Sequence, residues 1–250
     1  MFFLACKTHK RDEFVSKNRF LKITDPNKAS QATCLIESSY KMSVPAKRVM
    51  LLLLSQIHPA QQDVSNKITI HAQDYSKRTG LNFDQSYKDI KNGCRELMKT
   101  IITMKDAKAK TTEECVVVSW MKYHENEGWL EATFSVWIMP FIHLMARNGY
   151  TTIAINEALK FKSFHTIRLY ELLMQWESTG KRYISIMDLR NAFQLPKTSY
   201  PAFKDFRVRV LEPAVKEIVA KTNWEIKWDM VKTGRKITSI SFVFNKNSEE

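Results

Sequence analysis

Residues Ser199–Thr222 read SYPAFKDFRVRVLEPAVKEIVAKT, and the spacing of their apolar side chains predicts a helix. The apolar residues recur at steps of three and four, which places them on one face: Phe203, Phe206, Val210, Ala214 and Ile218. Basic residues lie on or beside the remaining surface: Lys204, Arg207, Arg209 and Lys216. Pro201 suits the first turn of a helix, where its missing N–H costs nothing, whereas Pro213 removes an interior hydrogen bond and predicts a kink.

The segments on either side complete a recognisable order of elements. Upstream, residues 181–198 predict a short strand, a short helix around Asp188–Phe193 and a turn at Leu195–Pro196. Downstream, Trp224–Met230 alternates apolar and polar residues, which indicates a half-buried strand. Lys232–Lys236 then turns, and KITSISFVF returns as a second strand. Helix, turn, basic helix and a hairpin with a basic tip form the outline of a winged helix-turn-helix, whose second helix enters the major groove of DNA.

The first half of the chain repeats this order. A strand around Ile68 and Ile70 and a short helix at Asp74–Thr79, stopped by Gly80, precede a longer helix that ends near Lys99 and that Asn82 or Asp84 can cap. That helix has an apolar face, Tyr87, Ile90, Cys94 and Leu97, and a basic face, Lys88, Lys91, Arg95 and Lys99. Strands are expected at Ile101–Lys105, Val116–Tyr123 and Trp129–Trp137, the last two joined by a turn at Glu125–Gly128.

We therefore predict an α+β protein with two tandem winged-helix domains in pseudo-twofold arrangement. Residues 1–34 form a basic N-terminal arm with a short strand near Phe20–Ile23, residues 35–147 the first domain and residues 148–250 the second, with the boundary near Arg147–Gly149. A helix at Pro45–Ile57 is apolar on more than one side, which indicates either plain core or a subunit contact. A second helix, from Ser163, is apolar apart from a polar stripe of Arg168, Glu171 and Gln175, and is expected to be the buried pillar of its domain.

Composition favours a polyanionic partner. The net charge is +13 and the sequence pI about 9.5, so nucleic acid is the first choice and an anionic membrane the second, with simple solubility as the competing explanation. The basic surplus lies towards both ends, while the middle is nearly neutral. The four cysteines show no paired spacing, which indicates reduced thiols in a cytosol rather than disulfides or a zinc site. No apolar run is as long as a membrane span.

The patterns of common catalytic sites are missing from the sequence. A nicking replication enzyme needs a His-x-His metal pair, and the six histidines include none. Thr179–Lys181 is followed by Arg182 and lacks the upstream glycine of a phosphate loop, so it is expected to be a turn. We therefore expect no catalytic residue, no metal and no cofactor. A DNA-processing enzyme whose site is assembled only in the fold remains an alternative.

DNA contacts are expected on two surfaces. In the second domain we expect Lys204, Arg207 and Arg209 to reach base edges, while Ser199 and Tyr200 hold phosphates. The alternative for Arg207 is an ion pair with Glu or Asp inside the protein. The hairpin tip should contact backbone or minor groove through Lys232, Arg235 and Lys236. A second, weaker surface comprises Lys77, Arg78, Lys88, Lys91 and Arg95, for which a solvated face is the alternative.

Four stretches carry a specific resemblance: Ile167–Leu173 (IRLYELL), Phe206–Ala214 (FRVRVLEPA), Glu217–Ile218 and the turn Lys232–Lys236. Through them the chain resembles, over about residues 35–245, the initiator replication proteins of theta-replicating, iteron-containing plasmids, often called initiator RepB or Rep type 3.

The resemblance implies a bacterial, cytoplasmic, non-catalytic protein with two winged-helix domains. Its members bind directly repeated origin sites on double-stranded DNA as monomers. Their dimers, joined through the first domain, bind an operator with an inverted repeat and repress their own gene. They open the origin and recruit host replication proteins (initiator, helicase, chaperones). The rival is a dimeric winged-helix transcription repressor without an initiator role. A duplicated module within one chain argues against it, because a simple repressor usually obtains its second module from a second subunit.

Overall fold

The computed structural model describes residues 27–57, 67–106, 110–124, 127–139, 142, 150–196 and 198–247. The first half contains β1 (Lys28–Ala32), α1 (Thr33–Glu37), α2 (Val44–Ser55), β2 (Lys67–His71), α3 (Ala72–Thr79), α4 (Phe83–Leu97), β3 (Ile101–Asp106), β4 (Thr111–Val116), β5 (Val118–His124) and β6 (Trp129–Phe134). The second half contains β7 (Tyr150–Ala154), α7 (Ile155–Ala158), α8 (Phe164–Met174), β8 (Lys181–Ser185), α9 (Ile186–Ala192), α10 (Phe203–Phe206), the π-helix η1 (Arg207–Leu211), α11 (Glu212–Lys221), β9 (Trp224–Thr233) and β10 (Lys236–Lys246).

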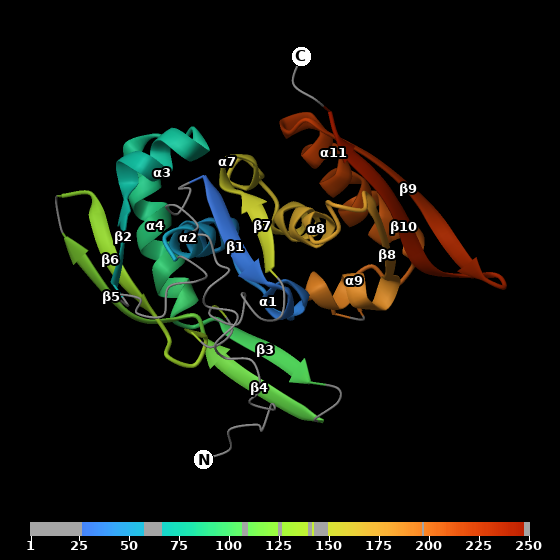
Figure 1. Cartoon of the computed structure of the whole chain (residues 1–250), viewed down its shortest axis with the longest axis horizontal. Coiled ribbons are helices and arrows are strands. Elements are labelled where there is room, and N and C mark those ends of the chain that lie inside the picture. The colour runs from blue at the N-terminus through green and yellow to red at the C-terminus, as the bar shows by residue number, and fades with distance from the viewer. Residues whose placement is uncertain are drawn as a thin grey trace, which may run out of the picture.

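The two halves have the same topology. Each has a three-stranded sheet in which the last strand lies in the middle and the first strand pairs with it: β2-β6-β5 in the first half and β8-β10-β9 in the second. A short helix and a longer helical segment follow the first strand of each half: α3 and α4 in the first, and α9 and the consecutive α10, η1 and α11 in the second. The hairpins point away from the centre on opposite sides of the molecule (Figure 1). The two winged-helix units predicted from the sequence are confirmed.

The repeat begins earlier than we expected, because each half opens with a short strand and a short helix. β1 and β7 pair antiparallel at the centre of the molecule, from Lys28↔Ala154 to Ala32↔Tyr150 (Figure 1). α1 packs on α8 and α7 packs on α2, so the opening helix of each half lies against the central helix of the other half, while the opening strand packs on the central helix of its own half. This exchange gives the two halves their pseudo-twofold relation.

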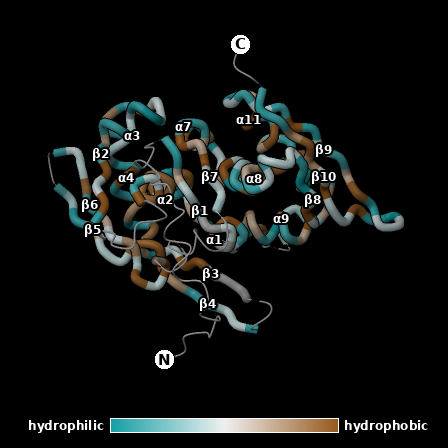
Figure 2. Tube along the Cα trace, in the orientation of Figure 1, coloured by the Kyte–Doolittle hydropathy of each residue, from teal (hydrophilic) through white to brown (hydrophobic). Residues whose placement is uncertain are grey.

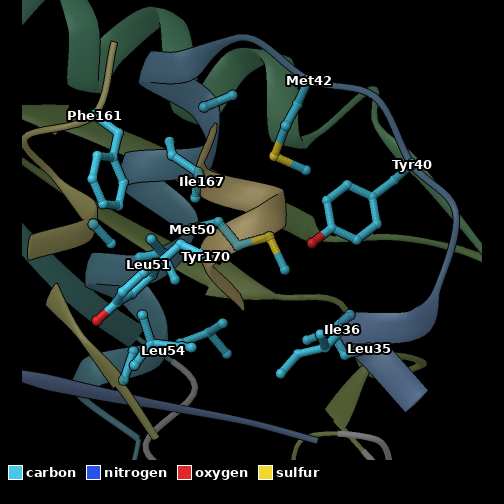
Figure 3. Close-up of a cluster of buried hydrophobic side chains, with 14 of the residues drawn as sticks. Leu35, Ile36, Tyr40, Met42, Met50, Leu51, Leu54, Phe161, Ile167 and Tyr170 are labelled. Atoms are coloured by element: carbon cyan, nitrogen blue, oxygen red, sulfur yellow. The ribbon is translucent and has the colours of Figure 1, made fainter. Parts of the chain in front are cut away.

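The helices α2 and α8 are the pillars of the core. Ser43 caps α2, with the amide of Ala46 donating to its hydroxyl at 3.3 Å. Figure 3 shows side chains of both pillars meeting those of the loops before them, among them Met42, Met50, Phe161 and Tyr170. One apolar core therefore spans both halves. The tip of the β9–β10 hairpin is hydrophilic (Figure 2).

The apolar stretch Val49–Leu54 of α2 is at most 4% exposed. Of the two readings of this helix, core is therefore correct and subunit contact is wrong, because no apolar surface is left for a second chain. α8 is buried as predicted, but its polar stripe does not face solvent. Arg168 and Glu171 are fully buried.

Two arginines at corresponding places in the pillars make reciprocal contacts across the pseudo-twofold. Arg168 donates through Nη2 to the carbonyls of Ile36 at 2.6 Å and Ser38 at 3.0 Å, in the first half. Arg48 donates through Nη2 to the carbonyl of Phe161 at 2.9 Å, in the second half. The arginine of each central helix thus hydrogen-bonds to the segment that precedes the other central helix.

A buried ionic network completes this junction. Glu171 accepts from Lys47 at 2.6 Å, from Arg168 at 2.8 Å and from the amide of Gln31 at 2.7 Å. Burial alone would raise the pKa of Glu171, but the cations of Lys47 and Arg168 hold the pKa below its ordinary value. The hydroxyl of Tyr40 accepts from Lys47 at 2.7 Å and from Arg168 at 2.6 Å.

The sheet strands differ from the sequence prediction in detail. The single strand expected over Val116–Tyr123 is two, because β4 ends at Val116 and β5 begins at Val118, with Val117 bent between them. β4 pairs with β3 in a separate two-stranded sheet. The strand after the turn ends at Phe134, before Trp137. The strand expected near residues 20–23 and the boundary near 147–149 lie outside the described residues, as do the first 26 residues of the arm.

The helix predicted over Ser199–Thr222 is shorter and is not uniform. It begins at Phe203, so Pro201 precedes it, and it passes through the π-helix η1 before α11. The amide of Glu212 donates to the carbonyl of Arg207, five residues back. Proline has no backbone N–H, so Pro213 cannot donate the usual helical hydrogen bond, and a wide turn of this kind accommodates that loss. The sequence predicted a kink at Pro213, whereas the structure has a π turn over Arg207–Leu211 directly before it, and Pro213 lies in the first turn of α11.

Candidate nucleic-acid interface

The turn before the second-half helix is held by Arg190, at the end of α9. Its guanidinium donates to the carbonyls of Pro196 at 2.9 Å, Ser199 at 2.5 Å and Tyr200 at 3.0 Å. It also lies 5.7 Å from the ring centroid of Phe206. Tyr200 has a φ of 52°, a left-handed conformation that tight turns use. These contacts set the angle between the two helices of the helix-turn-helix.

Ser185 begins α9 in a similarly fixed way. Its hydroxyl accepts from the amide of Asp188 at 3.0 Å and donates to the carboxylate of the same residue at 2.6 Å. We did not single out Arg190 from the sequence. The signal available was a basic residue in the last turn of a short helix before a Pro-containing turn, which also fits simple helix capping.

The segment α10–η1–α11, here called the reading helix, has one buried and one exposed face. Its buried side chains pack into the core: Phe206, Val210, Leu211, Ala214, Val215 and Ile218. Its first two turns expose Lys204, Asp205, Val208, Arg209 and Glu212. Within the part of the chain that the structure describes, neither Lys204 nor Arg209 is in an ion pair, so both cations are available to a polyanion.

Arg207 differs from its two basic neighbours. Its Nε lies 3.3 Å from Oε1 of Glu212, and its side chain is 35% exposed. The ion pair that we held as the alternative for Arg207 is therefore present, but on the partly exposed surface of the helix and not inside the protein. The π turn makes it possible, because it brings residues five apart onto neighbouring positions of the helix surface.

The hairpin tip, here called the wing, places three predicted cations together. β9 and β10 are joined at Gly234, with a φ of 61°, and Arg235. Lys232, Arg235 and Lys236 are all exposed, and none of them has an ion-pair partner among the described residues. The hairpin tip extends beyond the end of β8 (Figure 1), and the side chains of all three cations are exposed.

The first-half surface is only partly as predicted. Asn82 caps α4 by accepting from the amide of Gln85 at 2.8 Å. Along α3 and α4 the exposed cations are Lys77, Lys88 and Arg95. Lys91 is half-buried, with Nζ 4.7 Å from the ring centroid of Tyr123.

Arg78 is the exception on this surface. It pairs with Asp74 at 2.9 Å and donates to the side chains of Asn27 at 3.2 Å and Asn156 at 3.1 Å. Its contacts therefore join α3 to the residue before β1 and to α7. They give Arg78 a structural role between these elements, and its DNA contact stays a prediction.

The strongly shifted titrating groups lie in the interior and not on these surfaces. Burial raises the pKa of the Cys94 thiol to about 12, and burial is also the main cause that raises the pKa of Tyr75 and Tyr170. In the described ranges, no three His, Cys, Asp or Glu side chains are grouped to hold a metal ion. No helix in the same ranges is long and apolar enough to cross a membrane.

Comparison with known proteins identifies the family of the chain. The family model described as "Initiator Replication protein, WH1" matches residues 28–174, and the one described as "Initiator Rep protein, WH2" matches residues 185–244. An uncharacterised 27.6 kDa protein of Escherichia coli is 26% identical over 229 residues, covering 85% of this chain and 93% of the relative. The PI protein of Escherichia coli is 27% identical over 243 residues, covering 84% and 80%.

Two solved structures share the fold. The crystal structure of the Pi initiator protein in complex with iteron DNA matches with a TM-score of 0.77 and 24% identity, over 91% of this chain and 100% of that chain. Domains 2 and 3 of RctB match with a TM-score of 0.51 and 9% identity, over 83% and 84%.

Proposed function

The chain belongs to the initiator replication protein family, and we propose that it initiates plasmid replication by binding repeated origin sequences, or iterons. The observation that carries the proposal is the duplicated winged helix, whose second copy exposes Lys204 and Arg209 beside a basic wing. The iteron DNA bound by the structurally similar Pi initiator protein supports the same assignment.

The proposed division of labour follows exposure. Lys204 and Arg209 read base edges in the major groove, since long cationic side chains pair well with guanine there. Arg207 joins them only when DNA replaces Glu212 as its partner. Lys232, Arg235 and Lys236 neutralise phosphates or enter the minor groove. Ser199 and Tyr200 lie at the turn where the chain enters the reading helix, and they approach the backbone.

On the first half, the proposed phosphate contacts are Lys77, Lys88, Lys91 and Arg95. The two proposed DNA-contacting surfaces belong to units that share one core, so they would contact the same side of the duplex about one helical turn, roughly 10 base pairs, apart. We propose that the division of roles follows the repeat, with sequence reading in the second unit and positioning in the first.

Assembly and partners belong to the same proposal. A dimer joined through strands of the first unit would bind an inverted repeat and repress the chain's own gene. Host replication proteins would be recruited to the opened origin in the bacterial cytoplasm. We propose no catalytic role, because affinity for DNA here needs only cations and groove contacts.

Footprinting on the DNA that flanks the chain's own gene tests the function. The expected result is protection of several direct repeats with a constant spacing, and a plasmid carrying these repeats replicates only when the protein is supplied. Protection of a single inverted repeat, together with replication that does not depend on the protein, would favour the transcription repressor instead. Metal-dependent strand cleavage that one point mutation abolishes would favour an enzyme.

A further inference from the structure

Val208 has an unusual place on the reading helix. Its side chain is apolar but 46% exposed, and it lies between Arg207 and Arg209 on the outward-facing segment. The core does not use it, because Phe206, Val210 and Leu211 fill the buried face beside it. A single exposed valine elsewhere on a protein surface would need no explanation. Here the surface is the one proposed to lie against base pairs.

Val208 follows Lys204 by about one helical turn. Lys204 and Val208 are four residues apart and Lys204 and Arg209 are five apart, while the wide hydrogen bond of η1 joins Arg207 to Glu212 further along. One turn beyond Lys204 the helix therefore presents an apolar and a cationic side chain next to each other. Both would face the same groove as Lys204.

The major groove contains one apolar feature, the C5-methyl group of thymine. We propose that Val208 contacts a thymine methyl next to the base pair that Arg209 contacts, and so makes the chain specific for thymine at that position. The proposal rests on the proposed function of the reading helix. A β-branched side chain in a helix has one strongly preferred rotamer, so this contact would cost little side-chain entropy.

The contact can be removed from either side. In the DNA, uracil replaces thymine and removes only the methyl group. In the protein, Val208→Ser removes both methyl groups, and serine and valine have similar helix propensities. Val219→Ser is the matched control, because Val219 is 44% exposed on α11 of the same helix, three turns further along. Val208→Thr keeps one methyl group.

The measurement is binding of purified protein to an iteron duplex in which each thymine is replaced by uracil in turn. At one or two positions the wild type should lose about fourfold in affinity, the value of one buried methyl group. Val208→Ser should bind the thymine and uracil duplexes equally at those positions. Val219→Ser should keep the wild-type preference, and Val208→Thr should keep part of it.

If Val208→Ser and the wild type lose affinity alike at every position, or if no position responds to uracil in the wild type, the inference is wrong. Failure of the proposed function is recognised separately. In that case Arg209→Ala would leave the ratio of iteron to scrambled binding unchanged. If Arg209→Ala lowers that ratio while Val208→Ser behaves as the wild type, base reading by this helix is supported and only the proposed thymine contact of Val208 is wrong.

Discussion

Removing the charges of the wing tests the electrostatic part of the mechanism. The perturbation is the triple variant Lys232→Ala, Arg235→Ala and Lys236→Ala. All three side chains are exposed at a hairpin turn, so the substitutions create no cavity. Each cation that neutralises a phosphate contributes about 0.9 to the slope of log affinity against log salt concentration, so three should contribute about 2.7.

This slope sets the size of the effect. Between about 50 and 200 mM salt, a fourfold range, the ratio of wild-type to variant affinity should fall about 40-fold. The loss should be the same on an iteron duplex and on a scrambled duplex, because phosphates carry no sequence information. Fluorescence anisotropy titrations of both duplexes across a salt series measure both quantities.

The control is the double variant Lys181→Ala and Lys227→Ala. These lysines are exposed and lie in one cross-strand row with Val243, away from the hairpin tip of the same sheet. Their loss should change the slope by much less per residue than loss of the wing charges. A slope change below about 1 for the triple variant, or a loss confined to the iteron duplex, would refute phosphate binding by the wing.

Four further perturbations test the reading helix and the junction between the halves. Arg209→Ala should cost about 1–3 kcal/mol on an iteron duplex and much less on a scrambled one, and equal losses would exclude base reading. Glu212→Gln frees Arg207 from its ion pair, so titration with either duplex should show tighter binding; unchanged affinity would place Arg207 away from DNA. Arg168→Met should lower the free energy of unfolding in urea by about 3–5 kcal/mol, and a loss below about 1 kcal/mol would contradict a structural role for the buried network. The pKa of Glu171 is lower in the folded protein than in the unfolded chain. Its contribution to stability is therefore complete above the ordinary carboxyl pKa and is lost as the pH falls through the pKa of the folded state. Glu171→Gln should accordingly weaken the dependence of the free energy of unfolding on pH in the acid range.

The elements of each winged helix could be predicted because their signals are local. Ser43, Gly80 and Asn82 mark helix ends by their own hydrogen bonds or backbone conformation, and each does so in the structure. The alternation in Trp224–Met230 depends only on one face being covered. The same periodicities say which face is buried but not what covers it. The exchange of α1 and α7 between the pillars therefore has no signature in the sequence.

The candidate site was harder to predict than the fold. Lys204 and Arg209 are exposed as expected, but charge alone did not separate them from Arg78, whose partners Asn27 and Asn156 are distant in sequence. Pro213 shows from the sequence that one backbone hydrogen bond of the helix is missing. Either a kink or a π turn can accommodate this loss. The choice decides which side chains face outward, because a π turn shifts every later position around the helix axis.

The unequal surfaces of the two halves bear on the kind of DNA site. A pseudo-twofold pair of winged helices with equal surfaces would fit a palindrome, because each half would read the same bases on opposite strands. In this chain the second hairpin ends in exposed cations at Lys232, Arg235 and Lys236, whereas the first has the exposed carboxylate of Glu127, which accepts from the indole of Trp129 at 2.7 Å. The core is thus close to symmetric while the outer surface is not. One chain would therefore read an asymmetric sequence in one orientation, which a direct repeat supplies and an inverted repeat supplies only to two chains.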